Sequence, residues 1–178
     1  MKKKLQSQIG VTLIEIMTTV VIVGILAAMA TPFFERGIEQ VRFRSQAKNI
    51  TSMLRTARSM AISEKVPYGV NFDFSRGLIV MFKDSINPAA SQYDAGADPI
   101  VDVDSVEVNY AGSYTSFTTS SVVFQPNGTA SETGDVEIRY SSQKSYKTSQ
   151  INVLASTGRC KIMYINQDGT TSVDNPQG

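Results

Sequence analysis

The first part of the chain is dominated by one apolar run behind a short basic stretch. Residues 11–34 contain a single charge, Glu15, and as a helix these 24 residues would be roughly 36 Å long. The hydrocarbon core of a bilayer is about 30 Å thick. The pattern therefore predicts a helix that crosses a membrane.

The pattern changes after Pro32 to that of an amphipathic helix, and Pro67 is expected to end it. Apolar residues recur at spacings that keep them on one face, at Ile38, Val41, Ile50, Leu54, Ala57 and Ala61. Residues 35–65 contain seven basic and three acidic side chains. We interpret this charge as the solvated face of the helix.

From Tyr68 onward the apolar period is two, which is typical of strands. Residues 68–74 and 78–84 predict a hairpin around Ser75, Arg76 and Gly77. Further strands are predicted at 101–108, 122–125, 136–140, 151–154 and 160–165, with turns at 126–128, 157–159 and 168–169 and loops at 87–99 and 141–149. The fold class is therefore α+β: a long N-terminal helix, hydrophobic in its first half and amphipathic in its second, packed on antiparallel β-sheet.

Charge is nearly balanced overall, with 17 basic and 16 acidic residues, but it is unevenly placed. Lys2, Lys3 and Lys4 crowd the start with no acid nearby. A basic flank before an apolar helix stays in the cytoplasm by the positive-inside rule. We therefore expect a single-pass protein whose larger part lies on the other side of the membrane.

The composition excludes several kinds of active site. The chain contains no histidine, which rules out a Ser-His-Asp triad and histidine metal ligands. Cys160 is the single cysteine, so no intramolecular disulfide forms, and we expect it to be a small buried apolar residue. Asp102, Asp104 and Glu107 alternate along a predicted strand and are expected to form a solvated face. We expect neither an enzyme nor a metal or cofactor site.

Two features distinguish the apolar run from a standard secretory signal. The small residue Gly10 lies before the run instead of after it, and an acid, Glu15, lies inside it. With its basic leader and Pro32, the segment IG-VTLIEIMTTVVIVGILAAMATPFF resembles the N-terminus of type IV pilins and pseudopilins. This resemblance implies a leader of residues 1–10, cleavage by prepilin peptidase between Gly10 and Val11, and N-methylation of Val11, where the family usually has phenylalanine.

The same resemblance implies that Glu15 and Pro32 act in filament assembly. An ionised carboxylate in hydrocarbon is costly unless it has a partner, and the Val11 amino group of a neighbouring subunit would supply one. Pro32 removes one helical hydrogen bond and is expected to kink the helix or let it stretch. Residues 11–34 would then be the transmembrane and assembly helix, and 35–178 the extracytoplasmic domain.

The second half of the chain resembles the GspH/FimT family. The residues that carry this resemblance are VVFQPNGTA, VEIRY and INVLASTGRCK. It implies a minor pilin or pseudopilin at or near the tip of a type IV pilus or a type II secretion pseudopilus. The implied partners are other pilins, prepilin peptidase and the assembly platform of the bacterial inner membrane, with the domain in the periplasm and later in the filament.

An alternative function is binding of extracellular DNA for natural transformation. The stretch from residue 139 to 161 contains five basic residues and no acid: Arg139, Lys144, Lys147, Arg159 and Lys161. Such a patch can neutralise phosphates without reading sequence. Gly158-Arg159-Cys160-Lys161 also resembles the Gly-Arg-x-Arg motif of FimT-type competence pilins. A third interpretation, an ordinary single-pass membrane protein, requires the leader to stay attached.

Overall fold

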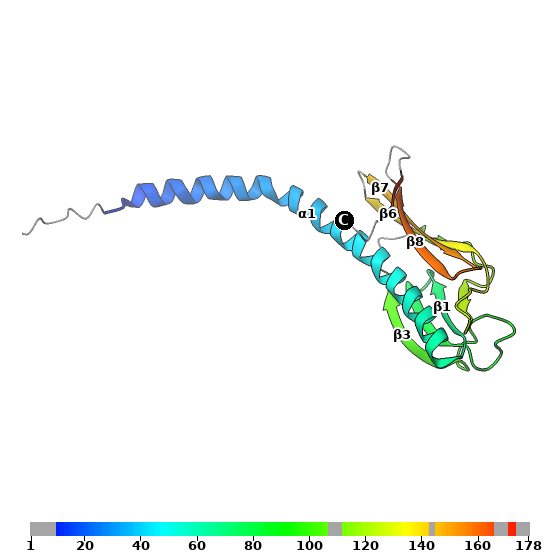
Figure 1. The fold of residues 1–178 in the computed structure, drawn as a ribbon. Coiled ribbons are helices and arrows are strands. Elements are labelled where there is room, and N and C mark those ends of the chain that lie inside the picture. Colours follow the sequence, from blue (N-terminus) through cyan, green and yellow to red (C-terminus); the bar gives the residue numbers. More distant parts are fainter. Residues whose placement is uncertain (1–9, 107–111, 143–144, 166–170, 174–178) are drawn as a thin grey trace, which may run out of the picture. The chain divides into compact units, whose positions relative to one another are not determined.

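The protein is described by a computed structural model that covers residues 10–106, 112–142, 145–165 and 171–173. Side chains are described for these residues apart from 31–36, 39–40, 140–142, 145–147 and 172–173. This part of the chain contains one helix followed by nine strands (Figure 1). It divides into two compact units, residues 1–42 and 43–178, and each is described by itself.

Helix α1 spans Leu13–Glu64 and is helical through Pro32 without a break. In the second unit the predicted apolar stripe is confirmed, because Ile50, Leu54, Ala57 and Ala61 are buried. The prediction is wrong for Ile38 and Val41, which are 53% and 68% exposed. The hydrophobic core takes its first helical side chain from Phe43, so the stripe begins later than the apolar spacing indicates.

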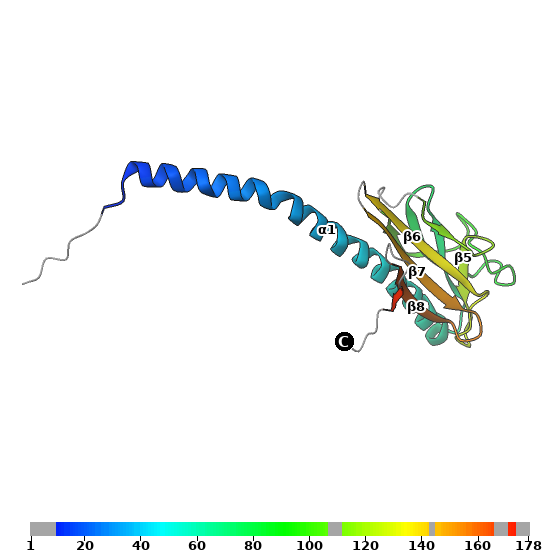
Figure 2. The same ribbon diagram turned by 90° about the horizontal axis from the view of Figure 1, so that it is seen from above.

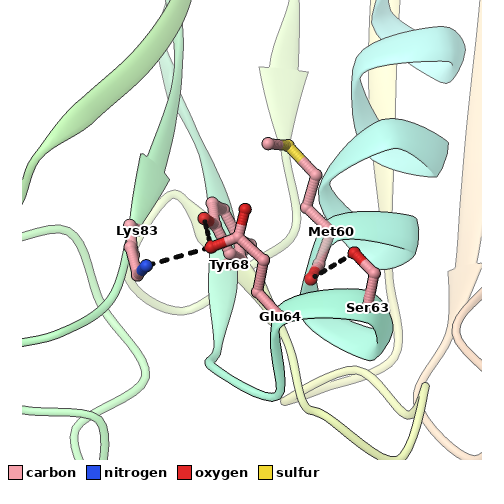
Figure 3. Close-up of polar contacts among 5 residues, drawn as sticks. All are labelled: Met60, Ser63, Glu64, Tyr68 and Lys83. Atoms are coloured by element: carbon pink, nitrogen blue, oxygen red, sulfur yellow. Dashed lines mark hydrogen bonds and ion pairs between the residues drawn. The ribbon is translucent and has the colours of Figure 1, made fainter.

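Hydrogen bonds connect the end of α1 to two strands. The helix ends at Glu64, so the predicted helix end before Pro67 is confirmed. Lys65 has a left-handed backbone, with φ of 60°, as helix ends often do. The Glu64 carboxylate accepts hydrogen bonds from the Tyr68 hydroxyl at 2.5 Å and the Lys83 ammonium at 3.0 Å (Figure 3). The Tyr68 bond and then the Lys83 bond lower the pKa of Glu64. These contacts fix the helix end against the two strands that follow it in the chain.

The first sheet contains the predicted hairpin and has strand order β3-β2-β1-β5. Its strands are β1 (Tyr68–Asp73), β2 (Leu78–Lys83), β3 (Ile100–Ser105) and β5 (Ser121–Phe124). The β1–β2 register pairs Gly69 with Phe82. A methyl group added at Gly69 would overlap the Phe82 ring, so glycine is needed at this position.

The second sheet has strand order β4-β6-β7-β8-β9. Its strands are β4 (Tyr114–Thr115), β6 (Gly134–Ser142), β7 (Ser145–Leu154), β8 (Arg159–Ile165) and β9 (Thr171–Val173). The predicted loop at 141–149 is wrong, because β6 and β7 pair there as far as Ser142 and Ser145. Cross-strand hydrogen bonds extend the hairpin through a serine-rich sequence whose composition is typical of loops.

Both sheets share one core with the second half of α1 (Figure 2). Alternate residues of the second sheet are buried in it, at Val136, Ile138, Ile151, Val153, Cys160 and Ile162. Every pairing among the described strands is antiparallel, in the first sheet and in the second. The α+β prediction with a helix packed on antiparallel sheet is confirmed.

A second buried layer lies under the connection between β2 and β3. The rings of Phe82 and Tyr93 pack with their centroids 4.9 Å apart. Beside them, Asp84 is fully buried, and its carboxylate oxygens have no hydrogen-bond partner within the described part of the chain. Burial, with the nearby charges of Asp98 and Asp94, raises the pKa of Asp84 to about 6.

Candidate functional site

The predicted cleavage position lies directly before α1. Gly10 and Val11 are exposed and precede the helix, which begins at Leu13. The Thr12 hydroxyl accepts a 3.4 Å hydrogen bond from the backbone N–H of Glu15, the arrangement of an N-terminal cap. The sequence Thr12-x-x-Glu15 has the spacing of a capping box, and the structure shows the hydrogen bond from the Thr12 side of it. Gly10 and Val11 lie outside the helix that this cap begins.

Glu15 lies in the first helical turn and is exposed. The free N–H groups of this turn favour a negative charge. The charge of Glu15 is thus compatible with helix formation even though the surrounding side chains are apolar. The prediction that Glu15 pairs with a neighbouring amino group concerns a second chain and remains a prediction.

The apolar half of α1 has no cover from the described part of its own chain. Between Val11 and Met29 the large apolar side chains are 54–81% exposed. Residues 13–30 have a mean hydropathy of 2.3 and are long and apolar enough to cross a membrane. Thr18 and Thr19 donate their hydroxyls to backbone carbonyls one turn earlier, which satisfies those polar groups inside the helix.

In the second unit, the two glycine turns singled out in the sequence lie against each other. Gly128, with φ of +85°, lies in the turn after β5, and Gly158, with φ of +59°, ends the turn between β7 and β8. A methyl group added at Gly158 would overlap the Gly128 carbonyl oxygen and the side chain of Arg58. Arg58 Nε donates a 2.9 Å hydrogen bond to that same oxygen. Through the Arg58 side chain, helix α1 therefore contacts both turns.

A hollow of about 440 Å³ lies between α1 and the turn at Gly158, and we call it the arginine pocket. Its lining includes Arg55, Arg58, Ile62, Gly158, Arg159 and Cys160. Cys160 is buried as predicted, and burial raises the pKa of its thiol to about 11, against a smaller opposing effect of Arg55 and Arg58. The thiol is therefore protonated at neutral pH and contributes no nucleophile.

Among the five basic residues predicted from the sequence, Arg139 and Arg159 lie far apart on the second sheet. Through β7, the registers place Arg139 opposite Thr148 and Arg159 opposite Leu154. Six residues of strand separate these rows, which is roughly 20 Å. Arg139 Nε also lies 2.7 Å from Glu137 Oε1, so its charge is paired.

The other three basic residues lie on β8, on β7 and outside the described residues. Lys161 is exposed on β8 opposite Asn152, whose side chain donates to Asp135 at 2.8 Å. Lys147 lies on β7, but its side chain is outside the described part, and Lys144 lies outside the described residues. A charge count that starts at Arg139 misses Asp135 and Glu137 just before it. In the structure these acids lie on β6 between the levels of Arg139 and Arg159, and Asp135 is level with Lys161.

The acidic strand is also observed. Asp102 lies exposed on β3 and Asp104 is half-buried, while Glu107 falls outside the described residues. Each of the two carboxylates accepts a hydrogen bond from the next backbone N–H, at 2.9 and 2.8 Å. Within the described part of the chain, no group of three ligating side chains could hold a metal ion.

The sequence did not single out Arg58. Its partners are the turns at Gly128 and Gly158, and the first is 70 residues away in sequence. One available signal was the presence of two basic residues, Arg55 and Arg58, three apart next to the apolar stripe. That spacing places both on one flank of a helix.

Comparison with known families agrees with this arrangement. A prokaryotic N-terminal methylation motif matches residues 5–31, which include the predicted cleavage position and most of the apolar run. The family of type II transport protein GspH matches residues 46–157, more than half of the 178 residues. The chain belongs to the GspH family.

One solved structure is similar in fold: the minor pseudopilin EpsH from the type 2 secretion system of Vibrio cholerae. The match covers 76% of this chain and 98% of EpsH, with 9% sequence identity and a TM-score of 0.49. No curated protein matches the sequence.

Proposed function

We propose that the chain is a minor pseudopilin of a type II secretion system. Prepilin peptidase cleaves it after Gly10 and methylates the amino group of Val11, and the mature subunit enters the pseudopilus through residues 11–34. The observation that carries this proposal is the presence of both parts in one chain. A methylation motif at residues 5–31 leads into an uncovered apolar helix, and a GspH domain follows it.

The apolar helix serves two environments in turn. In the bacterial inner membrane it spans the bilayer once, with the N-terminus cytoplasmic and residues 35–178 periplasmic. In the filament its exposed side chains pack against helices of other pilin-like subunits. Because both environments are apolar, one sequence suits both, and the assembly platform can move the subunit from lipid to filament at a small hydrophobic cost.

Glu15 directs the docking step. Its carboxylate pairs with the Val11 amino group of a neighbouring subunit, which exists only after cleavage. Processing would thereby control assembly, because an uncleaved leader leaves Glu15 without that partner. Pro32, which cannot donate to the helix ladder, gives the helix a point at which to bend or stretch during packing.

DNA uptake is not favoured as the function. The matching family is that of a type II transport protein. Of the basic residues that suggested DNA, Arg139 and Arg159 lie at different levels of the sheet, and Arg139 is paired with Glu137. A single continuous cationic surface, which phosphate binding requires, is not formed by Arg139 with Arg159.

Co-isolation with the filament tests the proposal. Sheared pseudopili from cells that overproduce them should contain the mature chain, and cells without prepilin peptidase should retain the full-length chain in the membrane. A chain without residues 11–34, exported by an unrelated signal, serves as the control and should stay in the periplasmic fraction. Equal recovery of this control with the sheared filaments would overturn the role of the helix.

A further inference from the structure

The arginine pocket has positive charge, and its described lining residues include no acid. Neither Arg55 nor Arg159 has an ion-pair or hydrogen-bond partner for its side chain among the described residues. Arg58 uses Nε on the Gly128 carbonyl, which leaves its two terminal amino groups as further donors. A guanidinium presents a planar fork that fits a carboxylate in two parallel hydrogen bonds. The pocket therefore offers a site for an anionic group from outside the domain.

Apolar surface and open backbone accompany these cations. Ile62, which is 39% exposed, forms part of the pocket wall. Strand β8 pairs with β7 along its length, but on its other side β9 pairs only with Met163–Ile165. Within the described chain, residues 159–162 thus keep an unpaired strand edge beside the pocket. Such an edge can add a further strand.

The other flank of α1 has the complementary character. β3 is the terminal strand of its sheet, and its Ile100, Val101 and Val103 side chains are 56%, 40% and 50% exposed. Asp102 and Asp104 alternate with them, and both line a hollow of about 330 Å³ against the helix. An uncovered edge strand with apolar side chains is a surface that proteins normally protect unless it binds a partner.

We propose that the arginine pocket binds an acidic edge strand of a neighbouring pilin-like subunit, of the kind that β3 presents on this chain. The proposal rests on the proposed function, since it names the chemistry of the neighbour that the filament brings to this domain. The incoming carboxylates pair with the arginines, and the incoming backbone pairs with residues 159–162. A contact between unlike flanks is not self-complementary, so it can continue from one subunit to the next, as a filament requires.

The same observations disfavour nucleic acid as the occupant. A duplex would need cations spaced along an open surface, whereas Arg55 and Arg58 converge with Arg159 on one hollow with an apolar wall. A peptide strand uses all three features, the cations, Ile62 and the strand edge. Nucleic acid uses only the first.

Fluorescence anisotropy with the full chain in neutral detergent micelles tests this inference. The probes are a labelled peptide of residues 99–106, the same peptide with asparagine at both aspartate positions, and a short DNA duplex. We expect the aspartate peptide to bind at least about tenfold more tightly than the asparagine peptide. Arg55→Gln with Arg159→Gln should remove most of this preference.

A matched control removes the same charge elsewhere. Arg76→Gln with Arg139→Gln should leave peptide affinity within about twofold, because neither residue lines the pocket or lies on the 159–162 strand edge. Equal affinity for the two peptides, or full retention in the pocket variant, would overturn the inference. Preferential binding of DNA that the pocket variant loses would assign the site to nucleic acid instead.

This outcome is separable from that of the proposed function. A chain that enters sheared filaments but does not prefer the aspartate peptide refutes only the occupant of the pocket. A chain that prefers the aspartate peptide but never leaves the membrane refutes only the role in the filament.

Discussion

The guanidinium of Arg58 donates a 2.9 Å hydrogen bond from Nε to the carbonyl oxygen of Gly128, and Gly158 lies against both groups. A helical side chain thus satisfies the backbone of one glycine turn where a second glycine turn approaches. A side chain larger than hydrogen at residue 158 would break this contact. We infer that the two glycines are needed for the sheet to pack on the helix. This role is independent of any binding by Arg159.

Arg58→Met should lower the free energy of unfolding by about 1–3 kcal/mol, because it retains much of the apolar stem but leaves the part-buried Gly128 oxygen without its donor. Arg55→Met provides the control, since the Arg55 side chain has no partner in the described chain, and should change stability by less than about 0.5 kcal/mol. Urea unfolding followed by circular dichroism measures both. Equal effects of the two variants would show that the hydrogen bond does not stabilise the domain.

Asp84→Asn should make the domain more stable above pH 6 and nearly unchanged below pH 4. The pKa of Asp84 is raised from 3.8 to about 6 in the folded domain. The protonated carboxyl therefore stabilises the fold fully below the unfolded-state pKa of 3.8, and this stabilisation is lost as pH rises through 6. Each pKa unit corresponds to about 1.36 kcal/mol, so the free energy of unfolding of Asp84→Asn should exceed that of wild type by about 3 kcal/mol at high pH.

Thermal unfolding of wild type and Asp84→Asn between pH 3.5 and 8 measures this difference. Glu64 and Asp73 have lowered pKa values and so lose stabilisation as pH falls, but they do this in both proteins and cancel. A constant difference across the whole pH range would contradict the assignment to Asp84.

A shortened chain that begins near Glu35 should be soluble and folded. The removed residues include the uncovered apolar helix, while every core side chain from Phe43 onward is retained. Size-exclusion chromatography should give a monomer, and urea unfolding should be a single transition. Aggregation of every chain begun between residues 31 and 42 would contradict this division of the protein.

Glu15→Gln should leave insertion and cleavage intact but weaken incorporation into filaments. The hydrogen bond to the Thr12 hydroxyl comes from the backbone N–H of residue 15, which glutamine retains while it removes the charge, so the helix start is preserved. The measurement is the amount of mature subunit in sheared filaments relative to the membrane. Glu39→Ala, an acid beyond the apolar run, is the control; wild-type recovery of Glu15→Gln would show that the carboxylate has no docking role.

The helix, the hairpin and the class of fold follow from the sequence because their signals are local. The apolar run and the spacing of Ile50, Leu54 and Ala57 predict where α1 lies and which face it buries. Alternation from Tyr68 to Lys83 predicts β1 and β2, and the glycine-containing turn predicts their pairing. Periodicity over adjacent residues is enough in these cases.

Other features depend on contacts between distant segments, and the sequence does not reveal them. Residues 141–149 look like a loop because serine and lysine are common there, yet β6 and β7 pair there as far as Ser142 and Ser145. The short strands β4 and β9 carry too little pattern to be recognised. Arg58 reaches a turn 70 residues away, and Arg139 lies far from Arg159 because strand register sets their spacing.

The central claim is that this chain is a processed pilin-like subunit, and intact mass of the membrane-extracted protein tests it most directly. In cells with prepilin peptidase, the wild-type protein should begin at Val11 and carry one additional methyl group, whereas Gly10→Val should keep its full leader. The same wild-type chain without the peptidase should also begin at Met1. A wild-type N-terminus at Met1 in the presence of the peptidase would contradict the account.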